Sequence, residues 1–143
     1  MNIRVTTISF FGFVAASSNK TLVSQRIGTP FHIKHIQASF APGTERLMKL
    51  YFFVSPDSAA PTTHVPTGTN LLAQTGQARY LTGDADSKSF GIEVSFAERG
   101  YYVKVYAVNT DTFAHTIDVQ ITIELEEPEE EVPLIKKWIG KLK

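Results

Sequence analysis

The chain of 143 residues contains no cysteine, a single tryptophan and no excess of either charge, since 14 Lys and Arg balance 14 Asp and Glu. Without cysteine, the chain can form no disulfide, zinc-thiolate site, iron–sulfur site or thiol nucleophile. The balanced charge argues against a nucleic-acid-binding protein, because phosphate binding requires an excess of basic side chains on one face. The length predicts one domain whose core needs no disulfide or metal for stability.

Long hydrophobic runs are also missing from the sequence. The apolar stretch over residues 8–16 is too short to span a bilayer, which takes about 20 residues. We interpret this stretch as part of a first β-strand. We therefore expect neither a cleaved signal peptide nor a transmembrane segment.

Strand signals, in contrast, are abundant. Short β-branched and aromatic runs alternate with clusters of Gly, Pro, Asn, Asp and Ser, and the apolar–polar alternation is clearest over residues 117–125. After the first strand, the runs cover residues 31–40, 47–54, 70–73, 78–81, 92–96, 101–108 and 117–125. This pattern predicts an all-β fold: a single antiparallel β-sandwich of jelly-roll type with seven to eight strands. We expect a bulge near Lys34 and His35, and the last three runs predict an antiparallel meander.

The last part of the chain differs in composition. Residues 1–125 form the predicted sandwich, residues 126–133 an acidic connector with two prolines, and residues 134–143 a basic arm. The arm carries four lysines, and its apolar residues recur at helical spacing after Pro133, which predicts a short C-terminal amphipathic helix.

No pattern in the sequence indicates catalysis or metal binding. The four histidines are His32, His35, His64 and His115; none has neighbours typical of a metal site, and on a strand the first two point to opposite faces. Asp84 and Asp86 resemble the start of a calcium loop, but the missing further ligands and Lys88 favour a plain turn. We expect no enzyme, no metal and no cofactor; a hydrolase would require two acids brought together by the fold.

Two groups of apolar residues are candidate partner-binding sites. Tyr51, Phe53, Tyr102 and Tyr106 lie on strand faces that should be polar in a solvated sandwich. Such residues form a second core layer beneath a loop or the arm, a subunit interface, or a platform for sugar stacking. The second group is the apolar side of the arm, which would dock on its own sandwich, on a neighbouring subunit or on a membrane surface. It comprises Leu134, Ile135, Trp138, Ile139 and Leu142.

One segment resembles a known family. The sequence from Glu98 to Tyr106, together with residues 70–73 and the alternating run that ends at residue 125, resembles the closing hairpin of bacterial pre-peptidase C-terminal-like β-sandwich modules. The resemblance implies a non-catalytic accessory domain attached to a secreted enzyme.

These observations favour a non-enzymatic structural protein. We expect a virion capsid or decoration subunit, in a virion or another extracellular assembly, that forms a homo-oligomer, a trimer or larger, and docks on another structural protein. The alternative is a carbohydrate- or protein-binding accessory module in which Tyr51, Tyr102 and Tyr106 form the stacking platform. Neither interpretation involves nucleic acid.

Overall fold

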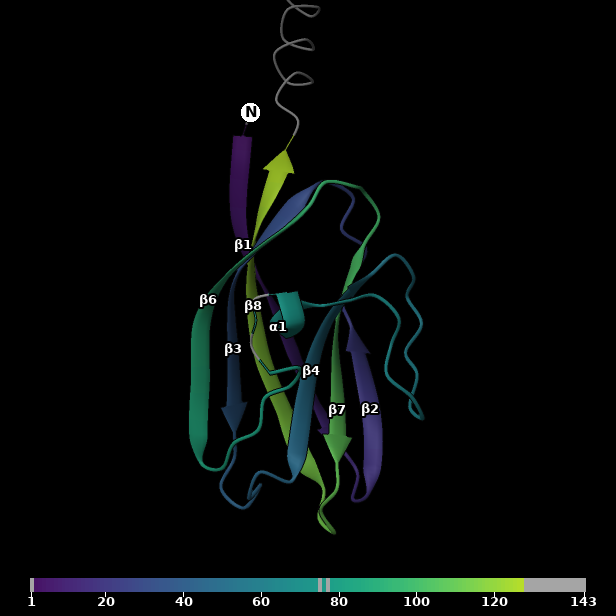
Figure 1. Cartoon of the computed structure of the whole chain (residues 1–143), viewed down its shortest axis with the longest axis vertical. Coiled ribbons are helices and arrows are strands. Elements are labelled where there is room, and N and C mark those ends of the chain that lie inside the picture. The colour runs from purple at the N-terminus through teal and green to yellow at the C-terminus, as the bar shows by residue number, and fades with distance from the viewer. Residues whose placement is uncertain (1, 75, 77, 128–143) are drawn as a thin grey trace, which may run out of the picture.

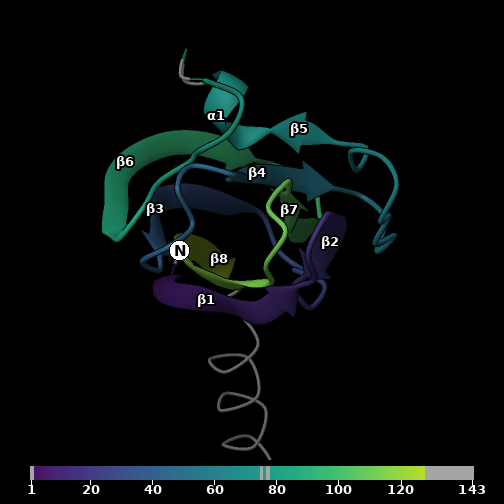
Figure 2. The same ribbon diagram turned by 90° about the horizontal axis from the view of Figure 1, so that it is seen from below.

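The structure, a computed structural model, describes residues 2–74, 76 and 78–127. Eight strands form two four-stranded sheets that face each other across one core (Figures 1 and 2). The strands are β1 (Asn2–Val14), β2 (Ser18–Val23), β3 (Phe31–Phe40), β4 (Met48–Ser55), β5 (Thr69–Asn70), β6 (Asp86–Phe96), β7 (Tyr102–Asn109) and β8 (His115–Glu127). The predicted arm over residues 134–143 and most of the predicted connector lie outside the described residues.

The order of the strands defines the topology. One sheet has the order β1-β8-β3-β6 and the other β2-β7-β4-β5. The antiparallel pairs β1–β8, β2–β7, β3–β6 and β4–β5 are those obtained when one long hairpin ribbon is wound around a core, which is the jelly roll. The predicted fold class, a jelly-roll sandwich of seven to eight strands, is confirmed.

The predicted meander is wrong. β6 and β8 belong to one sheet, whereas β7 lies in the other, between β2 and β4. Each of the two connections therefore crosses from sheet to sheet. Apolar–polar alternation indicates which side of a strand is buried, but it does not indicate which strand becomes the neighbour.

Two predicted short strands are also different in the structure. Only Thr69 and Asn70 pair with β4, and the next four residues form α1 (Leu71–Gln74). The Asn70 side-chain oxygen accepts the backbone N–H groups of Leu72 and Ala73, so this residue caps the helix and ends the strand. Over residues 78–81, only Leu81 forms a bridge, to Leu50 of β4.

The core lies between the inward faces of the sheets, and the bulge in β3 changes which of its side chains face this core. The pairing of β3 with both neighbours shifts register between Ile33 and His35, which confirms the predicted bulge. Ile33 and Ile36 are three residues apart and would face opposite sides of a regular strand. Because of the extra residue, both side chains are fully buried in the core.

Candidate functional site

The outer face of the β2-β7-β4-β5 sheet carries the four aromatic residues singled out from the sequence. Phe53 and Tyr106 are only 5% and 2% exposed, whereas Tyr51 and Tyr102 are half-buried. The loop between β4 and β5, residues 56–68, covers part of this face. It contacts β2 through a hydrogen bond from the Thr21 hydroxyl to the carbonyl of Pro61. This loop and its contacts form a second layer outside the sheet.

An ion pair between a buried lysine and a half-exposed aspartate fastens the loop to the sheet. The Lys104 side chain on β7 is fully buried, and its ammonium donates to a carboxylate oxygen of Asp57 at 2.8 Å. Asp57 also accepts the backbone N–H of Ala59 at 3.0 Å and the hydroxyl of Thr67 at 3.1 Å. These three donors, Lys104 above all, lower the pKa of Asp57 to about 2. The carboxylate therefore remains charged at all but strongly acidic pH.

Three of the four predicted aromatic residues come together, with a fourth ring that the sequence did not single out. The Tyr51 ring lies 6.3 Å from Phe53, 5.8 Å from Tyr106 and 5.4 Å from Tyr80, centroid to centroid. Tyr106 accepts a hydrogen bond from the Asn19 amide at 2.9 Å, and burial raises the pKa of its hydroxyl. Tyr102 lies farther along β7, opposite Ser55, so it is outside this cluster.

The cluster borders a shallow groove of about 480 Å³. Its lining includes Tyr51, Phe53, Val65, Arg79 and Tyr80, and the ammonium of Lys49 lies 4.9 Å above the ring of Tyr80. Aromatic rings beside two cationic side chains can stack on a flat ligand and interact with a negative charge. We call this feature the aromatic groove.

The outer face of the β1-β8-β3-β6 sheet is mostly polar. On β3, the Lys34 ammonium lies 2.6 Å from Glu93 and 3.6 Å from Glu124, and the hydrogen bond to Glu93 is the main cause of the raised pKa of Lys34. The two β3 histidines bond to serines on β6: His32 to Ser95 at 2.6 Å and His35 to Ser89 at 2.8 Å. Cross-strand polar pairs of this kind are typical of a sheet face in contact with water.

Strand β1 at the edge of this sheet departs from that pattern. Ile3, Val5, Phe11 and Phe13 are 59% to 65% exposed, and the rings of Phe11 and Phe13 form an edge-to-face pair at 6.0 Å. All four have odd numbers and therefore share the outward face of the strand. We call them the β1 stripe. Its signal in the sequence is a strand with apolar residues at odd as well as even positions, a pattern that predicts apolar outer faces in β4 and β7 too.

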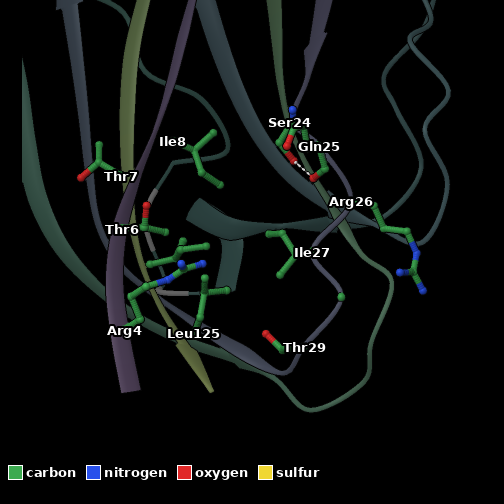
Figure 3. Close-up of a pocket in the computed structure, with 12 residues that line it drawn as sticks. Arg4, Thr6, Thr7, Ile8, Ser24, Gln25, Arg26, Ile27, Thr29 and Leu125 are labelled. Atoms are coloured by element: carbon green, nitrogen blue, oxygen red, sulfur yellow. Dashed lines mark hydrogen bonds between the residues drawn. The ribbon is translucent and has the colours of Figure 1, made fainter. Parts of the chain in front are cut away.

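A cavity of about 410 Å³ opens behind β1, between its inward face and residues 24–29. Figure 3 shows Ile8, Ile27 and Leu125 around this opening, with Arg4 close to Leu125 and Arg26 directed away from it. None of the twelve described residues that line it is acidic or a histidine. This lining mixes polar and apolar side chains and contains no carboxylate or imidazole that could act as a general acid or base.

The remaining polar candidates are dispersed. His64 bonds to the adjacent Thr63, and His115 lies 2.7 Å from Asp111. Within residues 2–74, 76 and 78–127, no group of three or more His, Asp or Glu side chains is placed to hold a metal ion. No helix in the same part of the chain is long and apolar enough to cross a membrane.

The residues described above define a protein of the jelly-roll β-sandwich class. No protein-family model and no curated protein matches the sequence. The chain is similar to a chain of the cyanophage Pam1 capsid asymmetric unit, with 12% identity, 87% and 86% of the two chains covered and a TM-score of 0.45.

It is also similar to a protein of infectious bursal disease virus strain Gx, with 9% identity, 90% of this chain and 33% of the viral chain covered, and a TM-score of 0.43. A third similar structure is the Yersinia pseudotuberculosis-derived mitogen, with 9% identity, 88% and 91% coverage and a TM-score of 0.41.

Proposed function

We propose that this protein is a non-enzymatic assembly subunit that associates with further copies of itself, as a capsid or decoration subunit does in a virus particle. The observation that carries the proposal is the β1 stripe, four large apolar side chains exposed on one face of one strand. They form two pairs, Ile3 with Val5 and Phe11 with Phe13, which are separated by the exposed polar residues Thr7 and Ser9. Large apolar side chains grouped in this way on the surface of a small sandwich are typical of a protein–protein interface.

The position of the stripe at a sheet edge supports the proposal. Among the described strands, β1 pairs only with β8, over its whole length of 13 residues. Edge strands that must avoid association usually carry lysine, proline or inward-pointing charges. β1 has no lysine and no proline, and its single charged residue is Arg4. In the described part of the chain, the backbone groups on the outer edge of β1 are therefore accessible to a partner strand, and no lysine or proline side chain of β1 opposes its approach.

The architecture agrees with this role but does not define it. Jelly rolls are the usual subunits of viral shells, and they also occur as lectin domains and cupins. One fold serves several functions, so the β1 stripe, and not the fold, supports the proposed association. Assignment to a virion remains part of the proposal.

The test measures mass in solution. We expect the purified chain to form oligomers by light scattering coupled to size exclusion. The double variant Phe11→Thr/Phe13→Thr, which keeps good strand formers at both positions, should shift the equilibrium strongly towards monomer. Val5→Ser should act in the same direction, whereas Val65→Ser, at a 45%-exposed valine in the loop over the other sheet, should not. A chain that is monomeric at all concentrations would contradict the proposal.

A second candidate function rests on the aromatic groove. Its rings and its cationic neighbours Lys49 and Arg79 favour a carbohydrate-binding module, the alternative drawn from the sequence, with Tyr80 as a platform residue in place of Tyr102. A glycan array followed by Tyr51→Ala and Tyr80→Ala tests it. Binding that both substitutions abolish and Tyr102→Ala leaves intact would support a carbohydrate site at the groove, and the absence of any glycan signal would exclude it.

A further inference from the structure

We propose that the outer face of the β1–β8 ribbon binds residues 134–143 of a neighbouring copy. The inference rests on the proposed self-association and names the segment that occupies the β1 stripe. It combines three observations: the side-chain pattern across β1 and β8, the sequence of residues 134–143, and the charge of the residues between β8 and that segment.

The receiving surface has two parallel rows. In the antiparallel register, Ile3 lies opposite Glu126, Val5 opposite Glu124, and Phe11 opposite Asp118. Directly opposed residues share one face of a sheet, so each of these apolar side chains has a carboxylate beside it. The outward positions of β8 from Thr116 to Glu126 include these three acids and no basic residue.

Basic side chains of the same sheet neutralise the acidic row only in part. Glu124 lies 3.6 Å from Lys34, which is also bound to Glu93, and Glu126 lies 4.0 Å from His32. Neither contact is a close one. The ribbon thus presents an apolar stripe bordered by an acidic row.

Residues 134–143 have the complementary composition. They contain the apolar residues named above at helical spacing, four lysines and no acidic residue. A helix of ten residues is about 15 Å long and is marginally stable alone in water. A segment of this length covers the Ile3 and Val5 end of the stripe, where its lysines would lie beside Glu124 and Glu126.

The connector favours a neighbouring copy over the same chain. β8 ends at Glu127, which pairs with Asn2 at the Ile3 end of the stripe. Within one chain, residues 128–133 would have to reverse and run back over Glu124 and Glu126. Those six residues include three glutamates and two prolines, and like charges repel each other at such close range. Directed outward, the same residues reach up to about 20 Å, enough to meet an adjacent subunit.

Because the chain has no cysteine, single cysteines give a clean test in the full-length protein. One preparation carries Val5→Cys and another Ile139→Cys; the two are mixed, re-equilibrated and mildly oxidised. We expect a disulfide between the two different chains, identified by mass after digestion. In the matched control, Leu47→Cys, at an exposed leucine outside both candidate sites, replaces Val5→Cys and should give roughly fivefold less of the mixed product.

Charge reversal tests the recognition of the acidic row. Glu124→Lys together with Glu126→Lys on the stripe-bearing chain should lower the yield of mixed disulfide roughly fivefold, in line with the modest strength of exposed ion pairs. Lys136→Glu together with Lys137→Glu on the other chain should restore it. Circular dichroism verifies that each variant remains folded.

Three outcomes would overturn the inference. The first is the absence of a disulfide between the mixed chains. The second, tested with a chain that carries both Val5→Cys and Ile139→Cys, is a disulfide that forms only within that chain. The third is a predominance of disulfides between two chains that both carry Val5→Cys, which would mean that two β1 strands pack directly. If the unmodified chain is still oligomeric in these cases, the proposed function stands and only the inference fails. If the unmodified chain is monomeric, both fail.

Discussion

The contact between Lys104 and Asp57 allows an asymmetric prediction about stability. The Lys104 side chain is completely buried, whereas that of Asp57 is 49% exposed. Replacement of Asp57 by Asn leaves an ammonium group under the loop without a counter-charge, and breaking a buried pair from one side is strongly destabilising. Replacement of Lys104 by Met leaves a carboxylate that water can still reach and that retains the N–H of Ala59 and the hydroxyl of Thr67. We therefore expect Asp57→Asn to cost clearly more than Lys104→Met.

The size of the effect follows from the exposure of the two groups. With one partner fully buried and the other half in water, Asp57→Asn should lose about half of the stability that is lost when a fully buried pair is broken. This loss corresponds to roughly 5–8 °C in Tm for a domain of this size. For Lys104→Met we expect a change of less than about 2 °C, because methionine fills a similar volume. Thermal unfolding followed by circular dichroism measures both.

The pH dependence provides an independent test of the same contact. The pKa of Asp57 is lowered from 3.8 to about 2 in the folded state, so its charged form stabilises the fold above pH 4, and this stabilisation is lost as the pH falls through 2. The Tm difference between the wild type and Asp57→Asn should be constant from pH 5 to pH 7 and should shrink towards pH 2. An equal cost for Asp57→Asn and Lys104→Met, or a difference that persists unchanged at pH 2, would refute the reasoning.

Two further predictions concern local features. Gly68 has a φ of +128°, and a Cβ there would lie 2.4 Å from the carbonyl oxygen of Val54. Gly68→Ala should therefore destabilise the fold by about 1–3 kcal/mol in urea unfolding, whereas Gly91→Ala, where a Cβ meets only ordinary contacts, should be neutral or stabilising; equal effects would contradict this account. The hydrogen bond from His115 is the main cause of the lowered pKa of Asp111. The advantage of the wild type over Asp111→Asn in urea should therefore be full above pH 4 and fall as the pH drops through the lowered pKa; an advantage that grows on acidification would contradict it.

The sequence contained enough information for the fold class but not for strand neighbours. Periodicity identified the strands that became β3, β4, β7 and β8, because their inward residues alternate and are buried. The sheet to which each strand belongs depends on how the chain crosses between layers, and a connection such as residues 97–101 has the same turn-like composition whether it forms a hairpin or a crossover. The error over the meander has this origin.

The candidate site was predicted in part. The sequence correctly indicated that β4 and β7 have apolar outer faces, and three of the four named aromatic residues come together there. It did not indicate Tyr80, which reaches the cluster from a segment without strand pairing at that residue. Pattern reasoning also did not single out Lys104, because a lysine is almost never fully buried unless it is paired. Its burial depends on an acid 47 positions away in the chain.

Connection length explains why the apolar outer face of β4 and β7 is covered whereas the β1 stripe is exposed. The loop after β4, residues 56–68, is long enough to return over the sheet, and its contacts through Asp57 and Pro61 keep it against β7 and β2. The turn after β1 has three residues, 15–17, before β2 begins, and three residues reach only about 10 Å. They cannot cover a stripe that spans 11 residues from Ile3 to Phe13 at about 3.3 Å each. Any segment that covers the β1 stripe would therefore have to come from another part of the chain or from another copy, which is why association is the function to test first.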